Sequence, residues 1–288
     1  MISALEIDLT VDLRPFAQYL RESGVPHRIT QEGLKQVVWV PTPAHAASVA
    51  DLFEDFNMGN LPPLQTRPSP SSGFNILAVG FRFPLTVTII FINLVVFIIT
   101  QYFDSTGSIF RLMLFSDFRI EDRLAFFDSL TDTIIKSEYW RLLTPMFLHF
   151  GLLHLAFNLL WVWEVGRRIE RVNGASTLLL VTLISSLVAN LFQYAISGPS
   201  FFGGMSGVVF GLFGYAFVWS QLVPGESIGL AKGIYLVMLG YLVLGFTGIF
   251  SLLGLGSLAN GAHLGGLVGG LVIGAIAGFL FRRKEEVP

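Results

Sequence analysis

Polar side chains that can do chemistry stand inside stretches that are otherwise apolar. His149, His154 and Asn158 lie in LHFGLLHLAFNLLW, Ser206 lies in GGMSGVVFGLFG, and His263 lies in ANGAHLGG. A serine whose proton is taken by a neighbouring histidine becomes a nucleophile for carbonyl carbon. These residue types therefore indicate acyl transfer, with Ser206 as the nucleophile and His263 as the base.

Acyl transfer also requires hydrogen-bond donors where negative charge develops on the carbonyl oxygen. Ser206 is expected to open a helix, so its own N–H is an unpaired donor at the positive end of the helix dipole. His154 and Asn158 are four residues apart, on one helix face, and add side-chain donors. No Asp or Glu occurs in the quoted segments, which favours a Ser-His dyad over a triad.

Each residue also has a structural interpretation. A lone serine in a membrane helix commonly bonds to a carbonyl one turn earlier, a lone histidine can pack or relay protons, and Asn158 can bond another helix. The serine, the histidines and Asn158 are all expected at a similar depth in the membrane, and this combination favours catalysis. The sequence lacks the HExxH of zinc proteases, and Val208 breaks the G-x-S-x-G of the hydrolase elbow.

The segments that carry these residues are predicted to span a membrane. Of the 288 residues, 53% are hydrophobic and 13% are charged, whereas a soluble domain has about 25% charged residues. Apolar stretches of roughly 20 residues, the length that a bilayer requires, cover 85–103, 145–166, 175–196, 205–223, 230–253 and 257–281. We therefore expect an α-helical polytopic membrane protein with six transmembrane helices.

Charge and cysteine content disfavour other classes. A net charge of −2 and a pI near 6.2 give no basic surface for nucleic acid. The absence of cysteine excludes disulfides and cysteine metal sites. No metal or nucleotide cofactor is implied.

Basic residues in the short connections predict the orientation. They follow the second and sixth stretches, as Arg167, Arg168, Arg171, Arg282, Arg283 and Lys284, and they do not occur in 197–204 or 254–257. The acidic start MISALEIDLT is unlike a signal peptide. Both termini are thus expected in the cytoplasm, with the serine and histidines in the outer half of the membrane.

Glycine spacing predicts how the fourth and sixth stretches meet. Glycines flank the serine at 203, 204, 207, 211 and 214, and they recur every four residues at 266, 270, 274 and 278. Small residues at this spacing let helix backbones approach closely. Such contact would bring Ser206 and His263 within hydrogen-bond reach.

Residues 1–58 are predicted to form a small soluble α+β domain. Alternation over 5–9 predicts a strand, and helical spacing over 11–22 predicts a helix. The runs 26–30 and 34–40 predict a hairpin, and 43–56 a second helix, which gives the order βαββα. The Pro- and Ser-rich segment 59–82 is interpreted as a linker to an intramembrane domain over 83–283. The connection 104–144 is predicted to be an amphipathic, interface-lying loop; a disordered loop is the alternative, which its phenylalanines disfavour.

These motifs resemble those of the rhomboid family of intramembrane serine proteases, in its bacterial form with an N-terminal domain. GGMSGVVFGLFG resembles the family's GxSG segment, HFGLLHLAFNLLW its HxxxN-bearing second helix, and ANGAHLGGLVGG its sixth-helix histidine. Tyr139-Trp140-Arg141 resembles the Trp-Arg pair of the first rhomboid loop. The resemblance covers about 75–281 and implies a six-helix rhomboid bundle.

The resemblance also implies roles for single residues. Ser206 and His263 would be catalytic, and His154, Asn158 and the Ser206 N–H would form the oxyanion hole. Supporting roles fall to Gly204, which allows close approach of the loop before the serine, to Gln193, which helps to hold water, and to His149. Phe210 stands where close relatives usually carry tyrosine, so the ring stack on the histidine is kept without the hydroxyl. The segment SGPSFF before Gly203 is one residue longer than in the family.

The sequence thus predicts an intramembrane serine endopeptidase of a bacterial inner membrane. Its partners would be transmembrane protein substrates, cleaved near the outer face, and membrane lipid; the fifth stretch would gate entry by family analogy. One rival is a non-catalytic rhomboid-like protein that binds membrane helices, which would lack the serine or the histidine. The other is a small-solute transporter, for which no inverted repeat or midplane charge is visible. The sequence leaves the oligomeric state open.

Overall fold

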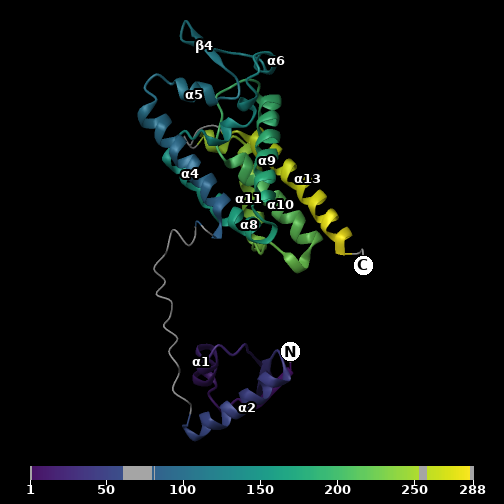
Figure 1. Ribbon diagram of the computed structural model, residues 1–288. Helices are drawn as coiled ribbons and strands as arrows, with labels where there is room; N and C mark the ends of the chain where they lie inside the picture. Colours follow the sequence, from purple (N-terminus) through teal and green to yellow (C-terminus); the bar gives the residue numbers. More distant parts are fainter. Residues whose placement is uncertain (1, 61–79, 81, 253–257, 286–288) are drawn as a thin grey trace. The chain divides into compact units, whose positions relative to one another are not determined.

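The computed structural model describes residues 2–60, 80, 82–252 and 258–285, and the chain divides into the compact units Met1–Phe74 and Asn75–Pro288 (Figure 1). Each unit is described by itself. The predicted linker 59–82 lies almost wholly outside the described residues. The domain boundaries given above therefore stay a prediction.

The N-terminal unit has the predicted βαββα order. Its elements are β1 (Ile2–Asp8), α1 (Arg14–Glu22), β2 (Arg28–Glu32), β3 (Lys35–Val40) and α2 (Pro43–Met58). The antiparallel sheet has the order β1-β3-β2, so the valine-rich β3 lies in the centre. Phe16 and Leu20, one turn apart on α1, are fully buried with Val38 of β3. The amphipathic spacing of α1 therefore supplies the core of this unit.

Apolar helices dominate the second unit. They are α4 (Pro84–Ile98) with its π-helical end η1 (Ile99–Phe103), α7 (Leu152–Trp161), the π-helical turn η4 (Val162–Gly166), α8 (Arg167–Asn173), α9 (Ala175–Ser197), α10 (Ser206–Leu222), the short turn η5 (Pro224–Glu226), α11 (Lys232–Phe246), α12 (Ile249–Leu252) and α13 (Asn260–Glu285). Among the described residues, Pro84–Phe103, Ala175–Ser197 and Asn260–Arg283 are long and apolar enough to cross a membrane, while α10 and α11 are shorter apolar helices. The predicted polytopic helical class is confirmed, and the count of six spans stays a prediction.

Two predicted helix bounds are wrong. The second helix begins at Leu152, not at 145, because Thr144–Phe147 forms the 3₁₀ turn η3 and residues 148–151 are not helical. Here the carbonyl of Pro145 accepts the N–H of Gly204, at 2.9 Å, so this backbone supports a distant loop. The fifth helix ends at Phe246, because the chain turns at Gly248 with φ +75° before α12. Residues 253 and 257, where the predicted fifth stretch ends and the sixth begins, lie outside the described residues.

The connection 104–144 is folded. It contains α5 (Ser108–Met113), the hairpin strands β4 (Phe118–Glu121) and β5 (Leu124–Phe127), α6 (Leu130–Ile135) and the 3₁₀ turn η2 (Tyr139–Leu142). Arg141 is buried, at 2% exposed. Its Nη1 donates to the carbonyls of Arg111, Leu112 and Leu114 at 2.6, 3.0 and 3.1 Å, and its Nε donates to Glu138 at 2.7 Å. One guanidinium thus ties η2 to the end of α5.

The core of the second unit surrounds α10. This helix is buried along most of its length and packs against α9 and α13 (Figure 1). At the opposite end from Ser206, the buried carboxylate of Glu170 accepts the N–H groups of Leu85 and Thr86, at 2.8 and 2.9 Å. These N–H groups are donors that the first turn of α4 leaves unpaired. The beginning of α4 is therefore fixed by α8.

Candidate active site

Ser206 and His263 lie side by side although 57 residues separate them. Ser206 is the first residue of α10, and His263 lies in the first turn of α13. The distance between Ser206 Oγ and His263 Nε2 is 2.9 Å, a hydrogen bond. The imidazole is 2% exposed, and its Nδ1 has no partner among the described residues. Nε2 is therefore the ring nitrogen that faces the hydroxyl, and no carboxylate of the described residues bonds to Nδ1.

Glycines on two faces of α13 let this helix pack closely against α9 and α10, and this packing positions His263. A Cβ on Gly266 or Gly270 would lie 1.9 Å from the carbonyl oxygen of Gly207 or Gly211. On the second face, a Cβ on Gly265 would lie 2.5 Å from Cβ of Phe192 on α9. The helices α9, α10 and α13 thus meet at backbone distance, as the glycine spacing predicts for α10 and α13. No bulkier residue allows this approach, which sets the position of His263 against Ser206.

Two aromatic rings contact the imidazole of His263. Phe210 lies one turn after the serine. The centroid of its ring is 4.9 Å from that of the His263 ring, and the two ring planes are inclined by 32°. Tyr241 of α11 lies 5.9 Å from the same imidazole and 6.3 Å from Phe210. Ring contact with His263 therefore comes from both α10 and α11.

Two of the predicted oxyanion donors lie beside the loop that precedes the serine. Gly204 has φ +117°, and a Cβ there would lie 2.7 Å from His154 Nε2 and 3.7 Å from Asn158 Nδ2. Only glycine fits this position, for both its dihedral and its space. Asn158 is buried, and its Nδ2 donates to the carbonyl of His154 at 3.0 Å. Ser206 opens its helix, so its N–H has no partner within α10. His154 Nε2 and Asn158 Nδ2 thus lie close to Gly204, two residues before Ser206.

The remaining predicted residues hold the frame of the site. His149 is buried, with Nδ1 3.2 Å from the Phe147 carbonyl and Nε2 accepting the N–H of Met205 at 3.4 Å. Its ring contacts that of His154 at 5.0 Å. Gln193 accepts the N–H of Ala262 through Oε1, at 3.1 Å, and its Nε2 donates to Ser197 at 3.1 Å. Each side chain thus bonds the backbone of a residue next to Ser206 or His263.

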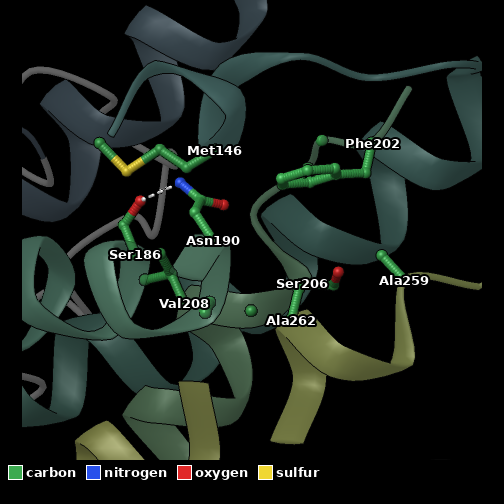
Figure 2. A pocket seen from close by; sticks show the side chains of 12 residues that line it. Met146, Ser186, Asn190, Phe202, Ser206, Val208, Ala259 and Ala262 are labelled. Atoms are coloured by element: carbon green, nitrogen blue, oxygen red, sulfur yellow. Dashed lines mark hydrogen bonds between the residues drawn. The ribbon is translucent and has the colours of Figure 1, made fainter. Parts of the chain in front are cut away.

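A narrow pocket opens beside Ser206 (Figure 2). Its free volume is about 10 Å³, which is about the room that one water molecule needs. The pocket is lined by Met146, Ser186, Ala189, Asn190, Phe202, Gly203, Gly204, Ser206, Gly207, Val208, Ala259 and Ala262. Gln193 does not line it. Among the described residues, no group of His, Asp and Glu side chains is placed to hold a metal ion.

Sequence reasoning missed Asn190 and Ser186. Both are polar residues in a predicted span, which is the signal for a functional residue. They are four residues apart on α9, and both line the pocket beside Ser206. The signal was therefore present in the sequence, although nothing there says which pocket they line.

A polytopic helical protein with a serine and a histidine joined at the buried ends of two glycine-rich helices belongs to a narrow structural class. Comparison with known families specifies it: the rhomboid domain matches residues 136–279, and the rhomboid N-terminal domain matches residues 1–65. The rhomboid domain alone covers half of the 288 residues. The chain belongs to the rhomboid family.

Curated relatives agree with this assignment. The chain is 40% identical over 137 residues to proteins named rhomboid protease GlpG from Salmonella newport (strain SL254), Salmonella typhi and Salmonella enteritidis PT4 (strain P125109). The match covers 48% of this chain and 48% of each relative. The chain thus spans about half the length of the curated relatives it matches.

Proposed function

We propose that the protein is an intramembrane serine endopeptidase that cleaves transmembrane segments through a Ser206-His263 dyad. The carrying observation is the 2.9 Å contact of Ser206 Oγ with His263 Nε2 inside an apolar helix bundle. Ser206 attacks the scissile carbonyl carbon while Nε2 takes its proton, and the imidazolium returns that proton to the leaving amine. Water then attacks the acyl enzyme while His263 takes its proton, and the imidazolium returns that proton to Ser206 Oγ as the ester bond breaks and the carboxylic acid product leaves.

The negative charge on the attacked carbonyl oxygen is stabilised by donors close to the nucleophile. Asn158 Nδ2 and the imidazole of His154 lie beside Gly204, which has no side chain to block the approach, and the Ser206 N–H follows two residues later in the chain. Each such donor is worth about 10²–10³ in rate when the site excludes water. Asn158 Nδ2 carries two N–H groups, so one can donate to the substrate while the other bonds the His154 carbonyl.

The substrate class follows from the location of the dyad. A peptide bond in a helix is shielded by its own hydrogen bonds, so the substrate must present an extended segment, which Gly or Pro near the cleavage point favours. With both termini in the cytoplasm of a bacterial cell, Ser206 lies in the outer half of the inner membrane, and cleavage occurs near the outer face. The relatives' printed name, rhomboid protease, supports the same class of activity.

Reconstituted cleavage tests the proposal. The full chain, purified and placed in liposomes, is expected to cut a model single-span substrate, and Ser206→Ala and His263→Ala are each expected to abolish cutting at unchanged folding. Folding is followed by the thermal unfolding midpoint of each variant. Cutting by folded Ser206→Ala at the wild-type rate would remove the proposed mechanism.

A further inference from the structure

The pocket beside Ser206 has a polar floor made by two residues of α9. Ser186 is 1% exposed and Asn190 is 5% exposed. Ser186 Oγ donates to the carbonyl of Leu143 at 3.2 Å, and Asn190 Nδ2 donates to the carbonyl of Leu142 at 2.8 Å. Asn190 Nδ2 also lies 3.4 Å from Ser186 Oγ. The hydroxyl proton of Ser186 and the amide protons of Asn190 are thus all directed to partners within the protein.

The orientation of the Asn190 amide is fixed by its neighbours. A carbonyl oxygen can only accept, so the atom 2.8 Å from the Leu142 carbonyl must be the amide nitrogen. The other terminal atom of the amide is therefore Oδ1, and Figure 2 shows it turned away from Ser186. Among the described residues, no donor bonds to Asn190 Oδ1. The polar floor consequently offers the pocket an acceptor and no free donor.

A hydroxyl of small size matches this pocket. The free volume of about 10 Å³ admits a water molecule or the end of a short side chain, and Met146, Phe202, Ala259 and Ala262 form apolar walls. Gly203 and Gly204 leave the side next to Ser206 without side chains. The carbonyl that Ser206 attacks belongs to the residue before the scissile bond, so the side chain of that residue lies nearest to the pocket.

We propose that Asn190 is a specificity-determining residue that selects serine immediately before the scissile bond, its hydroxyl donating to Asn190 Oδ1. This inference rests on the proposed proteolytic function. The serine hydroxyl replaces the hydrogen bond of a pocket water, whereas alanine supplies no donor. Cysteine has a similar shape and a weak S–H donor, so it ranks between serine and alanine.

The test compares matched substrates in one reaction. Two single-span substrates that differ only in serine or alanine before the scissile bond are mixed with the full chain in liposomes, and the ratio of the two cleavage rates is measured by mass spectrometry. The wild type is expected to cut the serine substrate about five- to tenfold faster, which is the worth of one hydrogen bond. Because both substrates meet the same enzyme, the ratio is independent of the folded fraction.

Variants assign the preference to one atom. Asn190→Ala and the similarly sized Asn190→Leu are expected to bring the ratio to about one, because both remove Oδ1. Ser186→Ala is the matched control on the same floor. It keeps the ratio, because the Leu142 carbonyl still holds the Asn190 amide in place.

The outcomes separate this inference from the function on which it rests. Equal cleavage of both substrates by the wild type overturns the inference and leaves the proposed function standing, and so does an unchanged ratio in a folded Asn190 variant. Where neither Asn190 variant folds, the wild-type ratio alone decides. Failure of the wild type to cut either substrate overturns the proteolytic function and the inference together.

Discussion

Gly266 of α13 lies so close to Gly207 of α10 that an added methyl group would be 1.9 Å from the Gly207 carbonyl oxygen. This contact lies one residue from Ser206 and three residues from His263 along the chain. Because backbone cannot yield as a flexible side chain does, the contact limits how α10 and α13 can shift, and with them the distance between Ser206, the proposed nucleophile, and His263, its proposed base. The proposed catalytic geometry therefore depends on glycine backbone atoms that have no role in the proposed reaction.

Replacing Gly266 by alanine is expected to separate α10 from α13. Overpacking of a tight contact costs about 1–3 kcal/mol, and a shift of about 1 Å between reacting groups costs about 10²-fold in rate. Gly240→Ala is the matched control, because a Cβ at that position of α11 meets nothing within 4 Å. Thermal unfolding and initial rates measured on both variants give the comparison. An unaltered midpoint and rate in Gly266→Ala would contradict the backbone contact.

Asn158→Ala is expected to lower kcat by 10- to 1000-fold, less than Ser206→Ala does. The loss follows from removing one donor near the oxyanion while the Ser206 N–H remains. Initial rates at saturating substrate provide the measurement. A loss as complete as that of Ser206→Ala, in a protein with an unchanged unfolding midpoint, would show that the asparagine does more than stabilise charge.

Phe210→Tyr is expected to keep activity, whereas Phe210→Ala loses about tenfold. The ring lies 4.9 Å from the imidazole of His263, and aromatic contacts are worth about 0.5–1.5 kcal/mol, close to the 1.36 kcal/mol of a tenfold rate change. The added hydroxyl of tyrosine does not alter the ring contact. Equal rates for the alanine variant and the wild type would show that Tyr241 alone orients the histidine.

Arg141→Ala is expected to destabilise the folded connection by about 3–5 kcal/mol, the usual cost of breaking a buried ion pair. Arg141 is 2% exposed, and its guanidinium donates hydrogen bonds to three carbonyls and to Glu138. Arg119→Ala is the control in the same segment: its ion pair with Glu121 is exposed, and such pairs contribute about 0–1 kcal/mol. Limited proteolysis between α5 and η2 is the readout. Equal cleavage of the two variants would refute the role of Arg141.

The same connection is expected to loosen in acid through Asp117. Burial alone would raise the pKa of this carboxyl, but hydrogen bonds from the Arg111 guanidinium and the Phe118 N–H outweigh it and hold the pKa below its ordinary value of 3.8. A lowered folded-state pKa stabilises the fold fully above pH 3.8, and that stabilisation is lost as the pH falls through the folded pKa. The protection of the β4 amides against hydrogen exchange, relative to the intrinsic exchange rate at each pH, is expected to fall below pH 3.8 in the wild type. In Asp117→Asn this protection is expected to depend less on pH. The same pH profile in both proteins would show that Asp117 does not cause the loosening in acid.

Much of the framework was predictable because hydropathy and glycine spacing are local signals. The βαββα order followed from periodicity, and the contact of α10 with α13 followed from glycines at every fourth position. The start of α7 was not predictable, because residues 145–151 lie in a predicted span, while their backbone forms the 3₁₀ turn η3 and then an irregular stretch up to Gly151. Hydropathy measures how apolar the side chains are, and it does not reveal which backbone groups are hydrogen-bonded to one another.

Long-range pairing accounts for the other misses. The β4-β5 hairpin turns at Asp122 and Arg123, which have φ +50° and +68°, and neither residue is a glycine that would mark the turn. Asn190 depends on the carbonyl of Leu142, 48 residues away. Its polarity in an apolar stretch was visible in the sequence, but the direction of its amide is set by tertiary structure alone.

Covalent labelling with a fluorophosphonate probe tests the central claim most directly, because the probe reacts only with a serine made nucleophilic by a base. The intact protein in detergent is labelled, digested and mapped by mass spectrometry, beside folded His263→Ala. The account predicts a single adduct on Ser206 in the wild type and its loss in the histidine variant. An adduct on another serine, or equal labelling of Ser206 without His263, would contradict it.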